Sequence, residues 1–132
     1  MTVALTGGTG FVGQAVLDEA ARRGLPVRAL TRREQAAREG VEWAAGDLTS
    51  ATALATLTQG SAAVIHVAGL TNAPDPAAFR AANVDGTAAV IAAMKAARVS
   101  RLVFVSSLSA REPGLSAYGA SKAEAEKLVE AS

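Results

Sequence analysis

The sequence contains no cysteine and a single histidine, and each shortage removes a class of functional site. Without cysteine the chain has no disulfide framework, no thiolate zinc site and no cysteine nucleophile. One histidine is too few for a metal site built from several imidazoles. Thirteen Lys+Arg residues nearly balance twelve Asp+Glu residues, so the formal net charge is +1. With that balance and no basic block, the charge pattern of a nucleic-acid-binding protein is missing.

Long apolar runs and aromatic residues are also scarce. No stretch approaches the roughly 20 residues that a transmembrane helix needs, and the first residues lack the basic-then-apolar pattern of an export signal. Aromatic residues make up 4% of the chain, whereas alanine supplies 32 of its 132 residues. Small side chains allow helices to pack closely on a sheet, and this length suits one domain. We therefore expect one soluble, cytoplasmic α/β domain with no membrane partner.

The apolar residues recur in a pattern that predicts alternating strands and helices. The predicted strands are Thr2–Thr6, Pro26–Thr31, Val41–Ala45, Ala63–Ala68 and Leu102–Ser106. The predicted helices are Phe11–Arg23, a helix capped by Thr49 or Ser50 and running to Thr58, Pro76–Arg98 and Ala117–Ala131, with a weaker helical segment near Arg33–Glu39. Strand and helix in repeated alternation predict a parallel sheet with helices on both faces.

Two further details concern the first predicted helix and the last predicted strand. In the first helix Val12, Val16 and Ala20 share one apolar face, and Gly24 can cap the helix. No strand follows the last helix, so Leu102–Ser106 forms an apolar edge strand, which folded proteins usually avoid. We therefore expect these residues to be the front part of a longer chain, and a strand supplied by a partner is the alternative.

Three glycines follow the first strand at a spacing suited to nucleotide binding, G-x-x-G-x-x-G. Glycine there permits a sharp turn, contact between the backbone and a pyrophosphate, and close packing of helix on strand. The first-turn N–H groups and the helix dipole then hold the anion. A purely structural turn is the alternative. The candidate cofactor-binding residues of this loop are Gly7, Thr9, Gly10, Phe11, Val12 and Gly13.

The residues after the second strand favour one dinucleotide over another. A P-loop is excluded, because the glycine loop does not end in Gly-Lys-Ser/Thr. An NAD or FAD site normally has Asp or Glu after this strand to bind the ribose hydroxyls, whereas this chain has Arg32 and Arg33. A guanidinium pairs with a 2′-phosphate, so the pattern favours NADP, with NAD as the alternative cofactor. Alternatively, both arginines simply open a solvated helix.

A tyrosine and a lysine four residues apart are the candidate catalytic pair. Tyr118 is the only tyrosine, and in a helix Lys122 lies on the same face one turn later. An unperturbed phenol is a poor base at neutral pH, but a nearby ammonium stabilises the phenolate and makes it usable as an acid or base. Ser106 and Ser107 end the fifth strand, where a hydroxyl could hold a carbonyl or alkoxide oxygen. An ordinary exposed Tyr–Lys pair is the alternative.

Six stretches of the chain occur in the order typical of one protein superfamily. They are Thr6–Gly13, Gly46–Leu48, His66–Gly69, Asn83–Thr87, Val105–Ser107 and Tyr118–Lys122. With them the chain resembles the short-chain dehydrogenase/reductase superfamily over essentially its whole length. It is most similar to the extended or atypical branch of NAD(P)-dependent epimerases, dehydratases and reductases.

The resemblance implies roles for the residues near the reaction. Ser107 is implied as the catalytic serine, with Ser106 as second choice and as a neighbour of the cofactor. Tyr118 is implied as the acid/base, and Lys122 as a hydrogen-bond donor to the nicotinamide ribose. Asn83 matches the family's helix asparagine and is expected to support the site rather than react.

The resemblance also implies the remaining cofactor contacts and the fold. Asp47 and Leu48 would border the adenine, and Ala68 and Gly69 would line the cofactor near its ribose. The implied fold is a Rossmann-type doubly wound parallel sheet. Extended members are much longer, so residues 1–132 are expected to be a dinucleotide-binding domain that lacks the last strand or strands and the C-terminal substrate domain. The family also implies a homodimer formed through the two long helices.

Other polar or aromatic residues are given structural roles. We expect His66 to be a buried, hydrogen-bonded imidazole and Trp43 to belong to the core. Ser109 and Arg111 precede Tyr118 in a loop and are candidates to face substrate. The segment from Ser107 to Tyr118 is shorter than in many sugar-nucleotide epimerases, which disfavours a sugar-nucleotide substrate.

The sequence thus predicts an NADP-binding oxidoreductase, epimerase or dehydratase that transfers hydride between nicotinamide and a small molecule's carbinol or carbonyl carbon. A non-catalytic NADP(H) sensor or assembly protein of the same fold is the first alternative, although it would not need the Tyr118–Lys122 pair. A nucleotide-sugar or methyl-donor binding domain is the second. No metal ligands are predicted.

Overall fold

The computed structural model describes residues 1–69 and 75–132. Within these residues five parallel strands form one sheet in the order β3-β2-β1-β4-β5. The strands are β1 (Val3–Thr6), β2 (Val27–Thr31), β3 (Val41–Ala45), β4 (Ala63–His66) and β5 (Leu102–Phe104). From β1 the chain adds β2 and β3 on one side of β1, and it then adds β4 and β5 on the other side. The carboxyl ends of β1 and β4 therefore form the switch point where ligands of such sheets bind.

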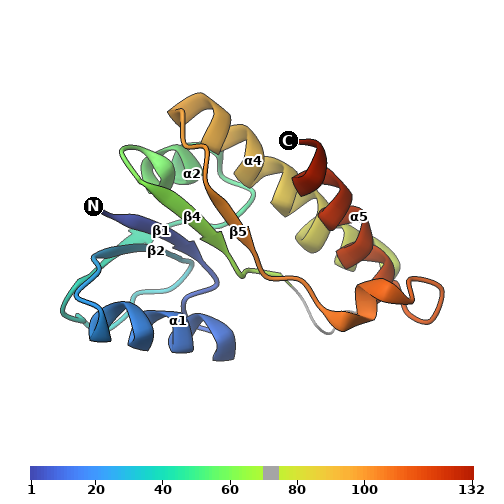
Figure 1. The fold of residues 1–132 in the computed structure, drawn as a ribbon, viewed down its shortest axis with the longest axis horizontal. Helices are drawn as coiled ribbons and strands as arrows, with labels where there is room; N and C mark the ends of the chain where they lie inside the picture. The colour runs from blue at the N-terminus through green and yellow to red at the C-terminus, as the bar shows by residue number, and fades with distance from the viewer. Residues whose placement is uncertain (70–74) are drawn as a thin grey trace.

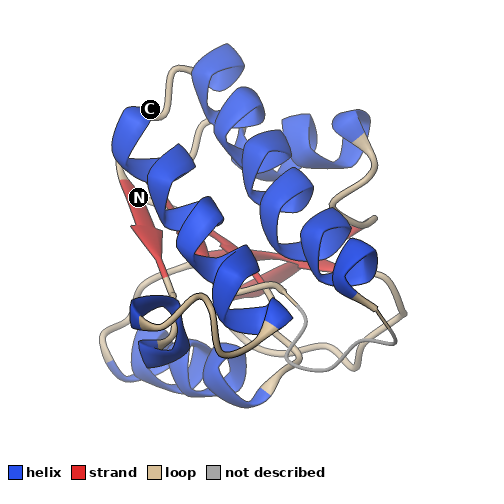
Figure 2. Cartoon of the chain, turned by 90° about the vertical axis from the view of Figure 1, so that its right-hand side faces the viewer, coloured by secondary structure: helices blue, strands red, loops and turns tan. Residues whose placement is uncertain are grey.

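Helices cover both faces of the sheet (Figure 1). The α-helices are α1 (Phe11–Arg22), α2 (Ala51–Thr58), α3 (Pro76–Phe79), α4 (Gly86–Ala97) and α5 (Ala117–Ala131). The π-helix η1 (Arg80–Asp85) joins α3 to α4, and the 3₁₀ turn η2 (Leu108–Arg111) precedes α5. Helix α1 lies on one face, and α2 and α4 lie on the other, with α5 beside α4 (Figures 1 and 2).

The two faces of the sheet carry separate aliphatic cores because successive strand residues point to opposite sides. In β1, Ala4 belongs to the core under α2 and α4, which includes Leu54 and Val90. The next residue, Leu5, belongs to the core under α1, which includes Leu17. All five side chains are buried. The predicted α/β fold with a doubly wound parallel sheet is confirmed.

The predicted helical segment near Arg33–Glu39 is wrong, because these residues form a non-helical connection. Side chains at both ends capture its backbone carbonyl groups. The Thr31 hydroxyl donates to the Arg33 carbonyl at 2.6 Å, and the Trp43 indole N–H donates to the Ala36 carbonyl at 3.2 Å. Trp43 itself is half-buried against the core under α1, as expected of a core residue.

The long predicted helix from Pro76 is interrupted by the six-residue π-helix η1. The predicted apolar face of α1 is also partly wrong. Val12 is 42% exposed, and the buried positions of α1 are Gly13, Leu17 and Ala20. The reason is that α1 begins against the glycine loop, so its first inward-facing position must be a residue without a side chain.

The strand β5 lies at the edge of the sheet, and Val103 in it is 56% exposed. An exposed apolar edge strand is an unpaired row of backbone donors and acceptors. Among the residues that the structure describes, no helix combines the length and apolar character needed to cross a membrane.

Candidate active site

The glycine loop after β1 is so tightly folded that two of its positions admit only glycine. Gly7 has a φ of +76°, and a Cβ atom there would lie 2.7 Å from the Ala68 nitrogen. A Cβ atom at Gly13 would lie 1.8 Å from the Gly7 carbonyl oxygen. Gly10 N–H donates to the same carbonyl at 3.2 Å. The loop thus brings the start of α1 directly against the end of β1.

The N-terminus of α1 has no side-chain cap, because its N-cap residue is Gly10, and its first turn contains no acidic residue. By contrast, Ser50, Asp75 and Ser116 cap α2, α3 and α5 through their side-chain oxygens. Unpaired first-turn N–H groups at the positive end of a helix dipole are donors for an anion. This donor set fits the pyrophosphate of a dinucleotide. Thr9, Gly10, Phe11 and Val12 are all exposed at this turn.

Charged residues follow β2 and β3 at the same edge of the sheet. Arg32 and Arg33 are exposed directly after β2. The Thr49 hydroxyl and amide donate to Asp47, and these bonds hold the pKa of Asp47 below its ordinary value, with a smaller contribution from Arg32. Leu48 packs so closely on the start of α4 that a Cβ atom at Gly86 would lie 2.8 Å from it.

The end of β4 lies between the glycine loop and helix α5. The Val67 and Ala68 amides both donate to the Thr6 hydroxyl oxygen at 3.1 Å. At Gly69 a Cβ atom would lie 2.5 Å from Asn83 Oδ1 and 3.5 Å from the Lys122 Nζ atom. Ala68 therefore lies against the glycine loop, and Gly69 lies against the residues of the predicted catalytic region.

Lys122 is buried at the end of β5. Its Nζ atom donates to the Val105 carbonyl at 3.2 Å and lies 4.9 Å from the centre of the Phe104 ring. Burial lowers the pKa of Lys122, and the Glu126 carboxylate opposes that shift. On the previous turn of α5 the half-buried Tyr118 ring contacts Phe79, with ring centres 5.9 Å apart. Helix α5 thus directs an ammonium into the carboxyl edge of the sheet.

The two serines after β5 have different environments. The Ser106 hydroxyl is buried and, among the residues described, has no hydrogen-bond partner. The Ser107 hydroxyl oxygen accepts the Ser109 amide at 3.2 Å and caps η2. A buried hydroxyl without a partner is uncommon, so a ligand oxygen is a natural partner for Ser106. Ser109 and Arg111 are exposed on η2.

The structure therefore brings most of the predicted site residues to one edge of the sheet. The glycine loop, Ala68, Gly69, Ser106 and Lys122 surround the carboxyl ends of β1, β4 and β5. The arginines stand apart from them, beyond β2. Sequence reasoning missed Phe104, whose only signal was its place one residue before Val105 in the last strand.

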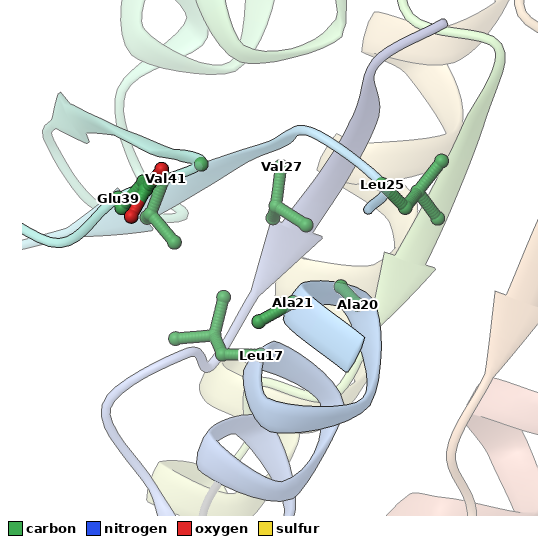
Figure 3. Close-up of a pocket in the computed structure, with 8 residues that line it drawn as sticks. Leu17, Ala20, Ala21, Leu25, Val27, Glu39 and Val41 are labelled. Carbon is green, nitrogen blue, oxygen red and sulfur yellow. The ribbon is translucent and has the colours of Figure 1, made fainter. Parts of the chain in front are cut away.

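At the amino ends of the strands the structure has two hollows that are lined mainly by aliphatic residues and glycine. A crevice of about 10 Å³ lies between α1 and the beginnings of β2 and β3, and Figure 3 shows residues that line it. An adjoining hollow measures about 390 Å³. Glu39 is the one charged residue lining either of them. The other lining residues of the crevice are Leu17, Ala20, Ala21, Leu25, Val27, Gly40 and Val41.

Comparison with known proteins agrees with this geometry. Residues 7–132 match the protein family described as NAD(P)H-binding. The ceramide reductase of Caulobacter vibrioides is 43% identical over 98% of this chain and 42% of its own length. A 4-hydroxy-2-methyl-3-oxo-4-farnesyl-3,4-dihydroquinoline-1-oxide ketoreductase of Stigmatella aurantiaca is 35% identical over 98% of this chain and 45% of its own length. The chain thus spans less than half the length of these relatives.

A solved structure of a short-chain dehydrogenase/reductase superfamily protein from Agrobacterium tumefaciens, with bound NAD, has the same fold. It aligns with a TM-score of 0.86 and 31% identity over 98% of this chain and 44% of its own. Sequence, glycine loop and fold agree, and the chain belongs to the NAD(P)H-binding family within the short-chain dehydrogenase/reductase superfamily.

Proposed function

We propose that this chain is the NADP-binding and catalytic part of a reductase that converts a ketone to an alcohol. The observation that carries the proposal is the buried Lys122 ammonium at the carboxyl end of β5. It lies at the same edge as the uncapped helix N-terminus and one helical turn from Tyr118. The reductase and ketoreductase names of the relatives favour a carbonyl substrate over a sugar-nucleotide epimerisation.

The proposed cofactor contacts use the residues at the carboxyl edge of the sheet. The amides of the first turn of α1 would hold the pyrophosphate, and Arg32 and Arg33 would bind the 2′-phosphate. Asp47 and Leu48 would border the adenine, and Ala68, Gly69 and Lys122 would line the nicotinamide ribose. When bound, the dinucleotide supplies hydride from its nicotinamide ring. These residues would bind and orient it.

The proton is handled by the side chains after β5 and on α5. Ser107, with Ser106 beside it, would hold the carbonyl oxygen of the substrate. As hydride reaches the carbonyl carbon, Tyr118 gives its hydroxyl proton to that oxygen, and the product is an alcohol. The Lys122 ammonium stabilises the phenolate that remains. This chain spans less than half the length of the two reductases, so the ketone substrate is proposed from their names.

The test of the catalytic pair uses the whole protein with NADPH and a panel of ketones. Tyr118→Phe should lower turnover at least about a hundredfold, because it removes the transferred proton. NADPH affinity should stay within about threefold, since the ring is retained. Lys122→Met should also lower turnover, whereas Lys127→Met, an exposed control on the same helix, should not. Turnover by Tyr118→Phe near the original rate would contradict the assignment, and NADPH binding without turnover of any ketone would favour the sensor alternative.

Cofactor choice has its own test. NADPH should bind at least about tenfold more tightly than NADH, because a guanidinium pairs with the 2′-phosphate. Arg32→Glu should reverse that order by repelling the phosphate. Arg23→Glu, an exposed arginine at the other edge of the sheet, is the control and should change neither affinity. Tighter binding of NADH to the unmodified protein would remove the role of Arg32.

A further inference from the structure

A continuous row of buried polar side chains joins the ends of β1 and β4 to helix α4. Thr6, His66 and Thr87 are each at most 1% exposed. The Thr6 hydroxyl lies 2.6 Å from His66 Nδ1, and His66 Nε2 lies 3.0 Å from the Thr87 hydroxyl oxygen. The expected structural imidazole is thus a link between two strands and a helix.

The row continues from Thr87 to the predicted catalytic helix. The Thr87 hydroxyl donates to the Asn83 carbonyl at 2.7 Å, within the π-helix η1. The Asn83 side-chain amide donates to the Ser121 hydroxyl oxygen at 3.0 Å, and that hydroxyl donates to the Tyr118 carbonyl at 2.8 Å. Single turns of π-helix are frequent at functional sites.

The hydrogen atoms of this row can be assigned by counting donors. Thr87 has one hydroxyl proton and gives it to the Asn83 carbonyl, so it must accept a proton from His66 Nε2. His66 Nδ1 is then bare and accepts the Thr6 hydroxyl proton. The Thr6 oxygen in turn accepts the Val67 and Ala68 amides. Every donor and acceptor is satisfied only by a neutral imidazole with its proton on Nε2.

The surroundings of His66 keep it neutral. Burial lowers the pKa of His66 to about 4, and the nearby Lys122 ammonium adds to that shift. The Phe104 ring, stacked on His66 with ring centres 5.8 Å apart, also lies against the Lys122 Nζ atom. A protonated His66 would therefore repel the Lys122 ammonium, which the proposed mechanism needs in its charged form.

We propose that His66 is a positioning residue, whose Nε2–H tautomer fixes the π-helix against the strand ends and so sets where Tyr118 lies relative to the glycine loop. Thr6 directly precedes that loop, and Asn83 holds the turn of α5 that bears Tyr118. The catalytic effect rests on the proposed function of Tyr118, whereas the tautomer does not. An imidazole that only fills space in the core is the competing explanation.

The tautomer is tested by ¹⁵N NMR of the imidazole, with the His66 signals assigned by their loss in His66→Gln. Between about pH 5 and pH 8 the signals should remain those of a neutral ring protonated on Nε2. Thr87→Ser should preserve them, and Thr87→Val should shift the Nε2 signal because its acceptor is gone. An Nδ1–H tautomer, or titration near the ordinary histidine pKa, would overturn the assignment.

The positioning effect is tested by kinetics on three threonine variants. Thr87→Val should lower kcat roughly tenfold to a hundredfold through misplacement of Tyr118 and leave NADPH affinity within about threefold. Thr87→Ser should restore kcat to within about twofold. Thr58→Val is the matched control, because Thr58 is equally buried and also donates to a helix carbonyl, that of Leu54 at 2.8 Å.

The control variant should lose stability without losing kcat. If Thr87→Val and Thr58→Val change kcat alike, or if serine fails to restore it, His66 is only structural. If Tyr118→Phe itself keeps full turnover, the proposed function fails while the tautomer measurement still stands. The two failures are therefore distinguishable.

Discussion

Three glycines at the carboxyl edge of the sheet stand in crowded places, whereas two glycines at the amino edge stand in open ones. After β1 and β4, a Cβ atom at Gly7, Gly13 or Gly69 would lie 1.8–2.7 Å from a neighbouring atom. Before β2 and β3, Gly24 and Gly40 have positive φ angles, as Gly7 does, yet no atom lies within 4 Å of a Cβ built there.

Glycine is required for a different reason at each edge. At the amino edge, positive φ alone explains the residue, because glycine ends a helix or turns the chain there. At the carboxyl edge, glycine allows backbone segments to touch, and in the proposed function this close approach is what presents amides to the dinucleotide. The polar groups follow the same division, since the imidazole and its hydroxyl partners lie at the carboxyl edge, and the crevice at the amino edge is mainly aliphatic.

The largest expected effect tests this division directly. Gly13→Ala should lower the free energy of unfolding by about 3 kcal/mol or more and abolish NADPH binding, because the methyl group meets the Gly7 carbonyl. Gly24→Ala should lower it by only about 1 kcal/mol, the strain of a positive φ, and leave binding intact. Urea unfolding and NADPH titration measure both. Equal losses would show that the two edges do not differ as described.

An intermediate effect should appear as pH dependence. The pKa of His66 falls from an ordinary 6.5 to about 4 in the folded chain, so between these values the unfolded chain binds more protons. The contribution of His66 to the free energy of unfolding should be fully present above about pH 6.5. It should decrease by roughly 3 kcal/mol as the pH falls toward 4.

The contribution of His66 is isolated by subtracting the pH profile of His66→Gln from that of the unmodified protein. The difference should slope downward with decreasing pH only inside this window. A flat difference would mean that the imidazole titrates alike in both states.

The smallest effect should be a gain at the amino edge. Arg98 ends α4 before β5 and has a φ of +60°, which makes it the one non-glycine residue with positive φ in the described chain. Arg98→Gly should raise the free energy of unfolding by about 1 kcal/mol because it removes that strain. Arg101→Gly, in the same connection, should not raise it. A loss of stability in Arg98→Gly would mean that its side chain contributes more than its backbone strain removes.

The sequence predicted the fold well because its signals are local. Apolar runs and helical spacing predicted all five strands and the bounds of α5 at Ala117 and Ala131. The glycine spacing likewise predicted the loop before α1. The segment near Arg33–Glu39 failed for the opposite reason, since its conformation depends on Thr31 and Trp43, which lie outside it.

The site was harder to predict than the fold because its contacts are not local. Thr6 and Thr87 lie 60 and 21 residues from His66, so nothing in the sequence indicated that they bind the two sides of its ring. The spacing of Tyr118 and Lys122 predicted a shared helix face. It could not predict that the lysine would donate to the Val105 carbonyl.

The π-helix between α3 and α4 changes which residues before and after it lie on the same face of the helix. A π-helix accommodates one residue more than α-helical geometry would, and each residue of an α-helix turns the surface by about 100°. Phe79 before this segment and Val90 after it therefore share no single α-helical register. The extra residue of η1 therefore sets the rotation at which Phe79 meets the Tyr118 ring, relative to the core residues of α4.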